Sequence, residues 1–270
     1  MSRSLVSRMS MQAAWLAFGL LSSAAASAQG FSALVSPPRF EDTAKPGTTY
    51  RNVIEISNIS AAASHFTLRT ADWTLDNQAA AVFADALAAD SCRPWVGLEA
   101  AQITIGANAK RRYRFEVAVP AGTPSGECRF AILLEGDPEP VANSVAPAVS
   151  GRIGIIVYLT IGDAAAQLSM TSAKAGIVDG RNVPVLQVRN SGNAHGRLTG
   201  LIDGVDARGQ KFVLTPSSVP LLPGETRAVA LTPEGDDADT PAPAIVYPLQ
   251  LKGRLEWGDQ RLAIDTVVGQ

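Results

Sequence analysis

The sequence has few of the residues from which metal centres and catalytic dyads are built. Its 270 residues include only two histidines and two cysteines, so a metal site with several Cys and His ligands is all but excluded. It also lacks a nucleophile elbow, a zinc-protease helix, a phosphate-binding loop and a dinucleotide-binding turn. We therefore expect a protein that is not an enzyme and that requires no metal and no cofactor.

Charge is equally scarce. Charged residues make up 18% of the chain, with 23 Lys and Arg against 25 Asp and Glu. This balance provides no polybasic face for nucleic acid or anionic lipid, while 46% hydrophobic residues argue against a disordered chain. No apolar run is long enough to span a bilayer, which needs about 20 residues. We expect no nucleic-acid partner and no membrane insertion.

The N-terminus has the three parts of a secretory signal peptide. Arg3 and Arg8 provide the positive region, an apolar run follows over residues 13–21, and small residues end in Ala26-Ser27-Ala28. We expect residues 1–28 to be removed during export, so that the mature chain starts at Gln29. Without Arg3 and Arg8 the count becomes 21 basic against 25 acidic residues.

Export determines how the two cysteines are interpreted. Cys92 and Cys128 are the only pair, and both lie in the first half of the chain. In an oxidising compartment an isolated pair is far more often a disulfide than a catalytic thiol. We predict a Cys92–Cys128 disulfide. A cysteine nucleophile acting with His65 or His195 is the weaker alternative.

Apolar residues recur at every second position, as in half-buried strands. Residues 113–119 alternate in this way, and so do residues 66–70 and 130–134. Frequent Gly, Pro and Asn turns separate these runs, which is typical of antiparallel sandwiches. About seven strands are expected before a seam near residues 162–165, and six or seven after it. The Ala-rich stretch 78–89 is interpreted as a loop with a helical turn.

A series of motifs follows the expected signal peptide in a recognisable order. Residues 35–40 (VSPPRF), 45–47 (KPG), 53–58 and 115–120 lead to a long apolar strand containing Tyr158, and the second half continues with residues 186–192 and 223–225. This order resembles the periplasmic pilus chaperones of the chaperone–usher pathway (PapD-like). The resemblance implies an all-β protein of two immunoglobulin-like antiparallel β-sandwich domains, residues 29–163 and 164–270, located in the periplasm.

The resemblance also implies a binding site. In that family an Arg and a Lys anchor the terminal carboxylate of a pilus subunit, and an adjacent strand completes the subunit's sandwich. Arg39 matches the family arginine; the lysine position falls on Ile155, and Arg152 is the nearest cation on that strand. The strand-donating residues would be Val145, Val149, Ile153, Ile155 and Val157. Pro147 interrupts this segment, and proline removes a backbone donor.

Three functions compete on these grounds. The resemblance favours a chaperone that binds and caps pilus subunits before delivering them to an outer-membrane usher. The alternative is an exported structural or adhesive β-sandwich protein of a cell-surface appendage. An exported hydrolase is the third, for which no catalytic constellation is found in the sequence.

Overall fold

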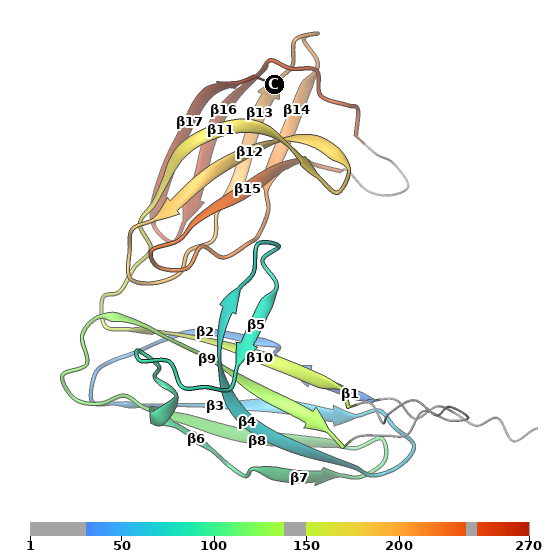
Figure 1. Ribbon diagram of the computed structural model, residues 1–270, viewed down its shortest axis with the longest axis vertical. Coiled ribbons are helices and arrows are strands. Elements are labelled where there is room, and N and C mark those ends of the chain that lie inside the picture. Colours follow the sequence, from blue (N-terminus) through green and yellow to red (C-terminus); the bar gives the residue numbers. More distant parts are fainter. Residues whose placement is uncertain (1–30, 138–149, 236–241, 270) are drawn as a thin grey trace, which may run out of the picture.

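Figure 1 shows the computed structural model, which describes residues 31–137, 150–235 and 242–269. The regular elements of these residues are β-strands, apart from one 3-10 turn, η1 (Arg93–Trp95). The first half contains β1 (Ala33–Ser36), β2 (Arg39–Ala44), β3 (Thr49–Asn58), β4 (Ser64–Leu75), β5 (Ala81–Ala84), β6 (Val96–Leu98), β7 (Gln102–Ile105), β8 (Lys110–Ala118), β9 (Gly126–Gly136) and β10 (Arg152–Ile161). The second contains β11 (Leu168–Val178), β12 (Arg181–Asn190), β13 (Thr199–Val205), β14 (Lys211–Pro216), β15 (Thr226–Pro233), β16 (Leu249–Trp257) and β17 (Gln260–Val268). The prediction of an all-β chain is confirmed.

Two sheets form a sandwich in the first half. One has the order β1-β3-β8-β6, and the other has the order β2-β10-β9-β4-β5, with β7 also on β4. The alternation read from the sequence places Tyr113, Phe115 and Val117 of β8 in the core, while Arg112 and Arg114 face outward. Burying one face of each sheet against the other is what holds such a sandwich together.

The chain changes sheet near its start. β1 pairs with β3, whereas β2 pairs with β10 in parallel, Arg39 lying opposite Ile156. Pro37 and Pro38 stand between the two strands. Because proline has no N–H to donate, the ladder with β3 ends there and a new one starts at Arg39. β2 therefore covers the edge of β10 only from Ile156 onward.

The second half is one continuous sheet of order β11-β12-β15-β14-β13-β16-β17. The sheet folds back on itself, so that β11 and β17 lie side by side (Figure 1). Leu186, Leu214 and Leu251 are fully buried in the core that it encloses. The predicted antiparallel sandwich is thus present here as two faces of a single curled sheet.

Each half has its own main hydrophobic core, one within residues 33–161 and the other within residues 166–268. Residues 162–165 connect them, and Gly162 there has φ +62°, a conformation that favours glycine. We propose that residues 29–163 and 164–270 are separate domains, as the sequence predicts.

The Ala-rich stretch 78–89 differs from its prediction, because Ala81–Ala84 forms β5 and pairs with β4. The Asp76 carboxylate accepts hydrogen bonds from the backbone N–H groups of Gln78 and Ala80, which closes a tight turn. Phe83 of β5 packs on Gly154, where a Cβ atom would approach the ring to 2.2 Å. Tertiary packing and turn chemistry thus outweigh the helical preference of the alanines. The described residues of the first half form ten strands, where the sequence predicts about seven.

The predicted disulfide is confirmed: Cys92 and Cys128 are bonded, with their Cα atoms 5.6 Å apart. It joins the segment before η1 to β9. The predicted signal peptide and the predicted donor residues Val145 and Val149 lie outside the described residues. Within the described ranges, we find no helix with the length and apolar character needed to cross a membrane.

Candidate functional site

The outer face of the β2-β10-β9-β4 sheet meets the second half. Trp73, Leu133 and Tyr158 on this face form a small apolar cluster with Leu222 of the second half. β4 and β5 rise from the sheet as a hairpin toward the second half (Figure 1), where Arg227 donates a hydrogen bond to the Asp76 carbonyl at 2.8 Å. Beside this contact is a groove of about 480 Å³ lined by residues of both halves, which we call the cleft.

Three cationic side chains converge on one oxygen at the cleft. The Oε1 atom of Glu41 lies 2.7 Å from Nε of Arg39, 3.2 Å from Nε of Arg197 and 3.7 Å from Nε2 of His195. The hydrogen bond from His195, and the charges of His195, Arg197 and Arg39, lower the pKa of Glu41 to about 2. Glu41 is therefore ionised under all physiological conditions.

His195 links the two halves through a second glutamate. The Glu127 side chain, on β9, is fully buried, and its Oε2 accepts a hydrogen bond from the His195 backbone N–H at 2.9 Å and contacts Nδ1 of the ring. The ring stacks on Tyr158 with centroids 3.8 Å apart. Burial alone lowers the pKa of His195, but the hydrogen bonds to Glu127 and Glu41 outweigh it and raise that pKa. The two carboxylates thus favour the protonated form of the ring.

A buried asparagine positions the loop that carries His195. The Oδ1 atom of Asn190 accepts hydrogen bonds from the N–H groups of Gln167 and Gly192, and its Nδ2 donates to the carbonyls of Ala194 and Leu221. Asn190 is fully buried, and all four contacts match the capacity of its amide. At Gly192 a Cβ atom would lie 2.2 Å from the Ala165 carbonyl oxygen, so this close approach requires glycine.

Arg197 is held independently of Glu41. Its Nη1 donates to the Ser218 carbonyl at 2.7 Å, its Nη2 lies 3.4 Å from the Tyr158 hydroxyl, and its guanidinium lies over the Tyr158 ring at 5.7 Å. Burial raises the pKa of that hydroxyl to about 12, so Tyr158 remains a neutral phenol. Arg197 is 19% exposed and points from the second half toward the first.

In the part of the chain that the structure describes, the edge of β10 beside Arg39 is open. Among the described residues, Arg152–Ile155 pairs with β9 on one side only, because β2 starts opposite Ile156. The Ile156 N–H donates to the Pro38 carbonyl. Since alternate residues of a strand direct their backbone groups to the same side, those of Arg152 and Gly154 point to the open edge. Such an edge is a template for a further strand.

The structure separates the two cations that the sequence suggests as an anchor. Arg39 lies opposite Ile156 of β10. Ile156 follows Arg152 by four residues, so the two positions are about 13 Å apart along the strand. Arg152 forms an ion pair with Glu135, which is also paired with Arg69. Ile155 and Val157 are fully buried in the core of the first half, and Ile153 packs partly against it. These three side chains thus face inward.

Sequence reasoning did not bring Glu41, Glu127, His195 and Arg197 together in one site. The sequence suggests His195 only as a partner of a cysteine nucleophile, yet its side chain is 11% exposed and pairs with two glutamates. One sequence signal was available, because Glu41 follows Arg39 by two positions and so lies on the same strand face. Nothing in the sequence indicates that residues 195 and 197 reach that face.

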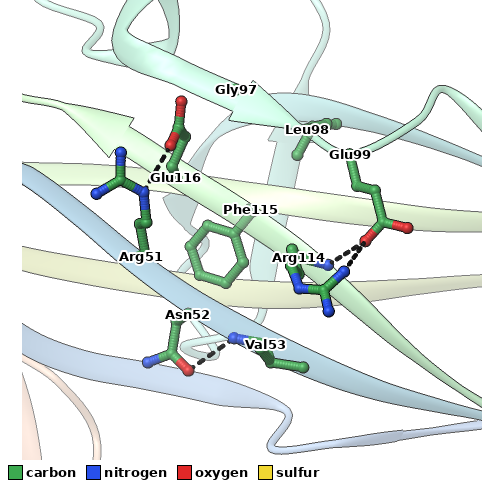
Figure 2. Close-up of a pocket in the computed structure, with 9 residues that line it drawn as sticks. All are labelled: Arg51, Asn52, Val53, Gly97, Leu98, Glu99, Arg114, Phe115 and Glu116. Carbon is green, nitrogen blue, oxygen red and sulfur yellow. Dashed lines mark hydrogen bonds and ion pairs between the residues drawn. The ribbon is translucent and has the colours of Figure 1, made fainter.

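A second groove of about 570 Å³ lies on the outer face of β3, β6 and β8. Figure 2 shows Val53, Gly97 and Leu98 in it, with the pairs Arg51–Glu116 and Arg114–Glu99 on its sides. None of the predicted site residues lines this groove. It is therefore separate from the cleft.

His195 should make stability pH-dependent. Since its folded-state pKa is raised, the contribution of the cation is complete below the unfolded value of 6.5. It is lost as the pH rises through the folded value. We expect the urea concentration at the midpoint of unfolding to decrease as the pH rises above 6.5 in the wild type, and to change less in His195→Gln.

The second histidine provides the matched control. His65 is exposed and hydrogen-bonds Thr104 within the first half. His65→Gln should retain the alkaline loss of stability. If His195→Gln loses stability over that pH range as the wild type does, His195 is not its source.

The sequence matches no family model and no curated protein. Among solved structures, the class 5 fimbriae chaperone CfaA is 13% identical with a TM-score of 0.47, and the match covers 87% of this chain and 99% of CfaA. The Pseudomonas aeruginosa CupB2 chaperone is 12% identical with a TM-score of 0.43, and the match covers 87% of this chain and 100% of CupB2. The E. coli chaperone DraB is 13% identical with a TM-score of 0.44, and the match covers 88% of this chain and 98% of DraB. All three of these structures are of chaperones.

Proposed function

We propose that this protein is a periplasmic chaperone that binds pilus subunits by strand addition and delivers them to an outer-membrane usher. The observation that carries the proposal is the open edge of β10 directly beside Arg39. An incomplete subunit exposes unpaired backbone groups and an apolar groove, and strand pairing covers both. No catalytic turnover is involved.

The position of β2 determines where a bound strand ends. A strand that pairs with Arg152–Ile155 meets the start of β2 at Arg39. A partner whose chain ends there places its terminal carboxylate at the Arg39 guanidinium, which is 51% exposed. Pairing of a guanidinium with a carboxylate is charge-assisted and directional. Arg39 thus sets the register of the added strand.

The remaining proposed contacts have different roles. The backbone of Arg152 and Gly154 provides the hydrogen bonds, while Ile155 and Val157 keep the strand rigid by packing in the core of the first half. Arg152 lies at the far end of the open edge, so we assign it to the body of the partner strand instead of its terminus. Val145 and Val149 remain proposed donors of apolar side chains.

Synthetic ten-residue peptides of alternating apolar and polar residues, ending in a free carboxylate or an amide, test this function. We expect the acid peptide to slow amide exchange at Arg152 and Gly154. Arg39→Ala should weaken binding of the acid peptide by about thirtyfold or more, since removing one member of a partly desolvated charge pair typically costs about 2–5 kcal/mol.

Arg112→Ala is the matched control, because Arg112 is an exposed arginine on β8 in the other sheet. It should bind both peptides as the wild type does. Unchanged exchange at residues 152–155 with either peptide would contradict strand addition. An exported structural or adhesive sandwich protein would then be the better interpretation.

A further inference from the structure

We propose that Glu41 occupies a carboxylate-binding site in the free protein, and that a partner's terminal carboxylate replaces it between Arg39 and Arg197. This inference rests on the proposed function and specifies its anchor. It assigns the second anchoring cation to Arg197, from the second half, instead of to Arg152 on β10. It also makes Glu41 an internal competitor of the partner.

The arrangement around Glu41 is that of a carboxylate site already filled. Nitrogen atoms of Arg39, Arg197 and His195 all lie within 3.7 Å of the single oxygen Oε1. Several donors directed at one acceptor oxygen are the geometry by which proteins bind carboxylates. The strong lowering of the Glu41 pKa reports the same positive potential. A second carboxylate of similar geometry would meet the same donors.

The site is preorganised on the side of the second half. Ser218 and Tyr158 hold the Arg197 guanidinium through contacts that do not involve Glu41, and Glu127 holds the His195 ring. These side chains therefore keep their positions when Glu41 leaves. Binding of the incoming carboxylate then requires little further ordering of the protein's side chains, which favours affinity.

Glu41 and Arg39 are the most exposed members of the site. The Glu41 side chain is 36% exposed and that of Arg39 is 51% exposed. Glu41 also lines the cleft of about 480 Å³, so its side chain has space to rotate away. Exchange of one carboxylate for another leaves the cations neutralised and returns Glu41 to water. Replacement thus avoids leaving a partly buried charge unpaired.

Arg152 does not fit the role of second anchor. It is paired with Glu135, which also binds Arg69, and it lies about 13 Å along the strand from the position opposite Arg39. Arg197 and Arg39 instead share a contact with the same atom of Glu41. One terminal carboxylate can therefore reach both of these arginines.

Glu41→Gln separates competition from a structural role. Removing the competing charge should raise affinity for the acid-ended peptide by about tenfold, as expected when an occluded site becomes available, and leave affinity for the amide-ended peptide unchanged. The same variant should unfold at a lower temperature, because the three cations lose their anion. If Glu41 had a purely structural role, Glu41→Gln would lower stability without improving binding.

Arg197→Gln tests the second anchor. It should weaken binding of the acid peptide by about thirtyfold.

Asp42→Asn is the control, since the Asp42 carboxylate accepts a hydrogen bond from Tyr50 and, among the described residues, the ion pairs of the three cations at this site are with Glu41 and Glu127. It should leave both affinities unchanged. Acid-peptide affinity that is unchanged or lower in Glu41→Gln, with residues 152–155 still protected, overturns this inference and leaves the proposed function standing. If neither peptide binds to any variant, the proposed function fails, and this inference fails with it.

Discussion

Replacing both Cys92 and Cys128 by alanine is expected to lower the free energy of unfolding of the first half by about 3–4 kcal/mol. The disulfide joins residues separated by 36 positions, and closing a loop of that length restricts the unfolded chain. Both cysteines are buried in the sandwich core. For a unit of this size the loss corresponds to a decrease of about 10 °C or more in Tm, measured by circular dichroism.

Reduction of the wild type provides an independent comparison, since it breaks the same bond without changing any residue. Reduced wild type and the double variant should unfold at similar temperatures. The second half contains no cysteine, so its unfolding should be unchanged. A decrease below about 1 kcal/mol would show that the sandwich restricts this loop by its own packing.

The strands of the fold follow directly from local sequence. Tyr113, Phe115 and Val117 alternate with charged residues, and this period of two is sufficient to specify a half-buried strand. The disulfide could also be predicted from the sequence, because two cysteines allow only one pairing. β5 was not predicted, since its sequence favours a helix and the strand depends on Phe83 packing over Gly154, 71 positions away.

The cleft could not be predicted for a different physical reason. Glu41, Glu127 and Arg197 come from separate strands and loops, and their meeting depends on how the two halves dock. The local motif of the sequence predicts an anchor at Arg39, but it could not show that Glu41 neutralises that arginine. Arg152 was selected for its position on the strand, and its ion pair with Glu135 depends on the register of β9 against β10.

Glu127→Gln is expected to loosen the contact between the two halves. The Glu127 side chain is fully buried between His195 and Arg129, whose Nη1 lies 3.3 Å from Oε1. Removing one partner of a buried ion pair typically costs about 3–5 kcal/mol, because the remaining charge stays unpaired. His195 can relieve part of this by losing its proton, so we expect about 3 kcal/mol. The unfolding temperature measured by calorimetry should fall accordingly.

The number of transitions is the more informative result, because it also tests the proposed domain boundary. If residues 29–163 and 164–270 are separate domains coupled through Glu127, the variant should unfold in two steps, whereas the wild type should unfold in one.

Glu135→Gln is the matched control, since Glu135 lies on the same strand and face but pairs with Arg69 and Arg152 within the first half. It should destabilise the first half without uncoupling the two. A single, equally cooperative transition in Glu127→Gln would mean that the apolar contact around Tyr158 and Leu222 suffices to join the halves, and that the His195–Glu127 pair only sets their orientation.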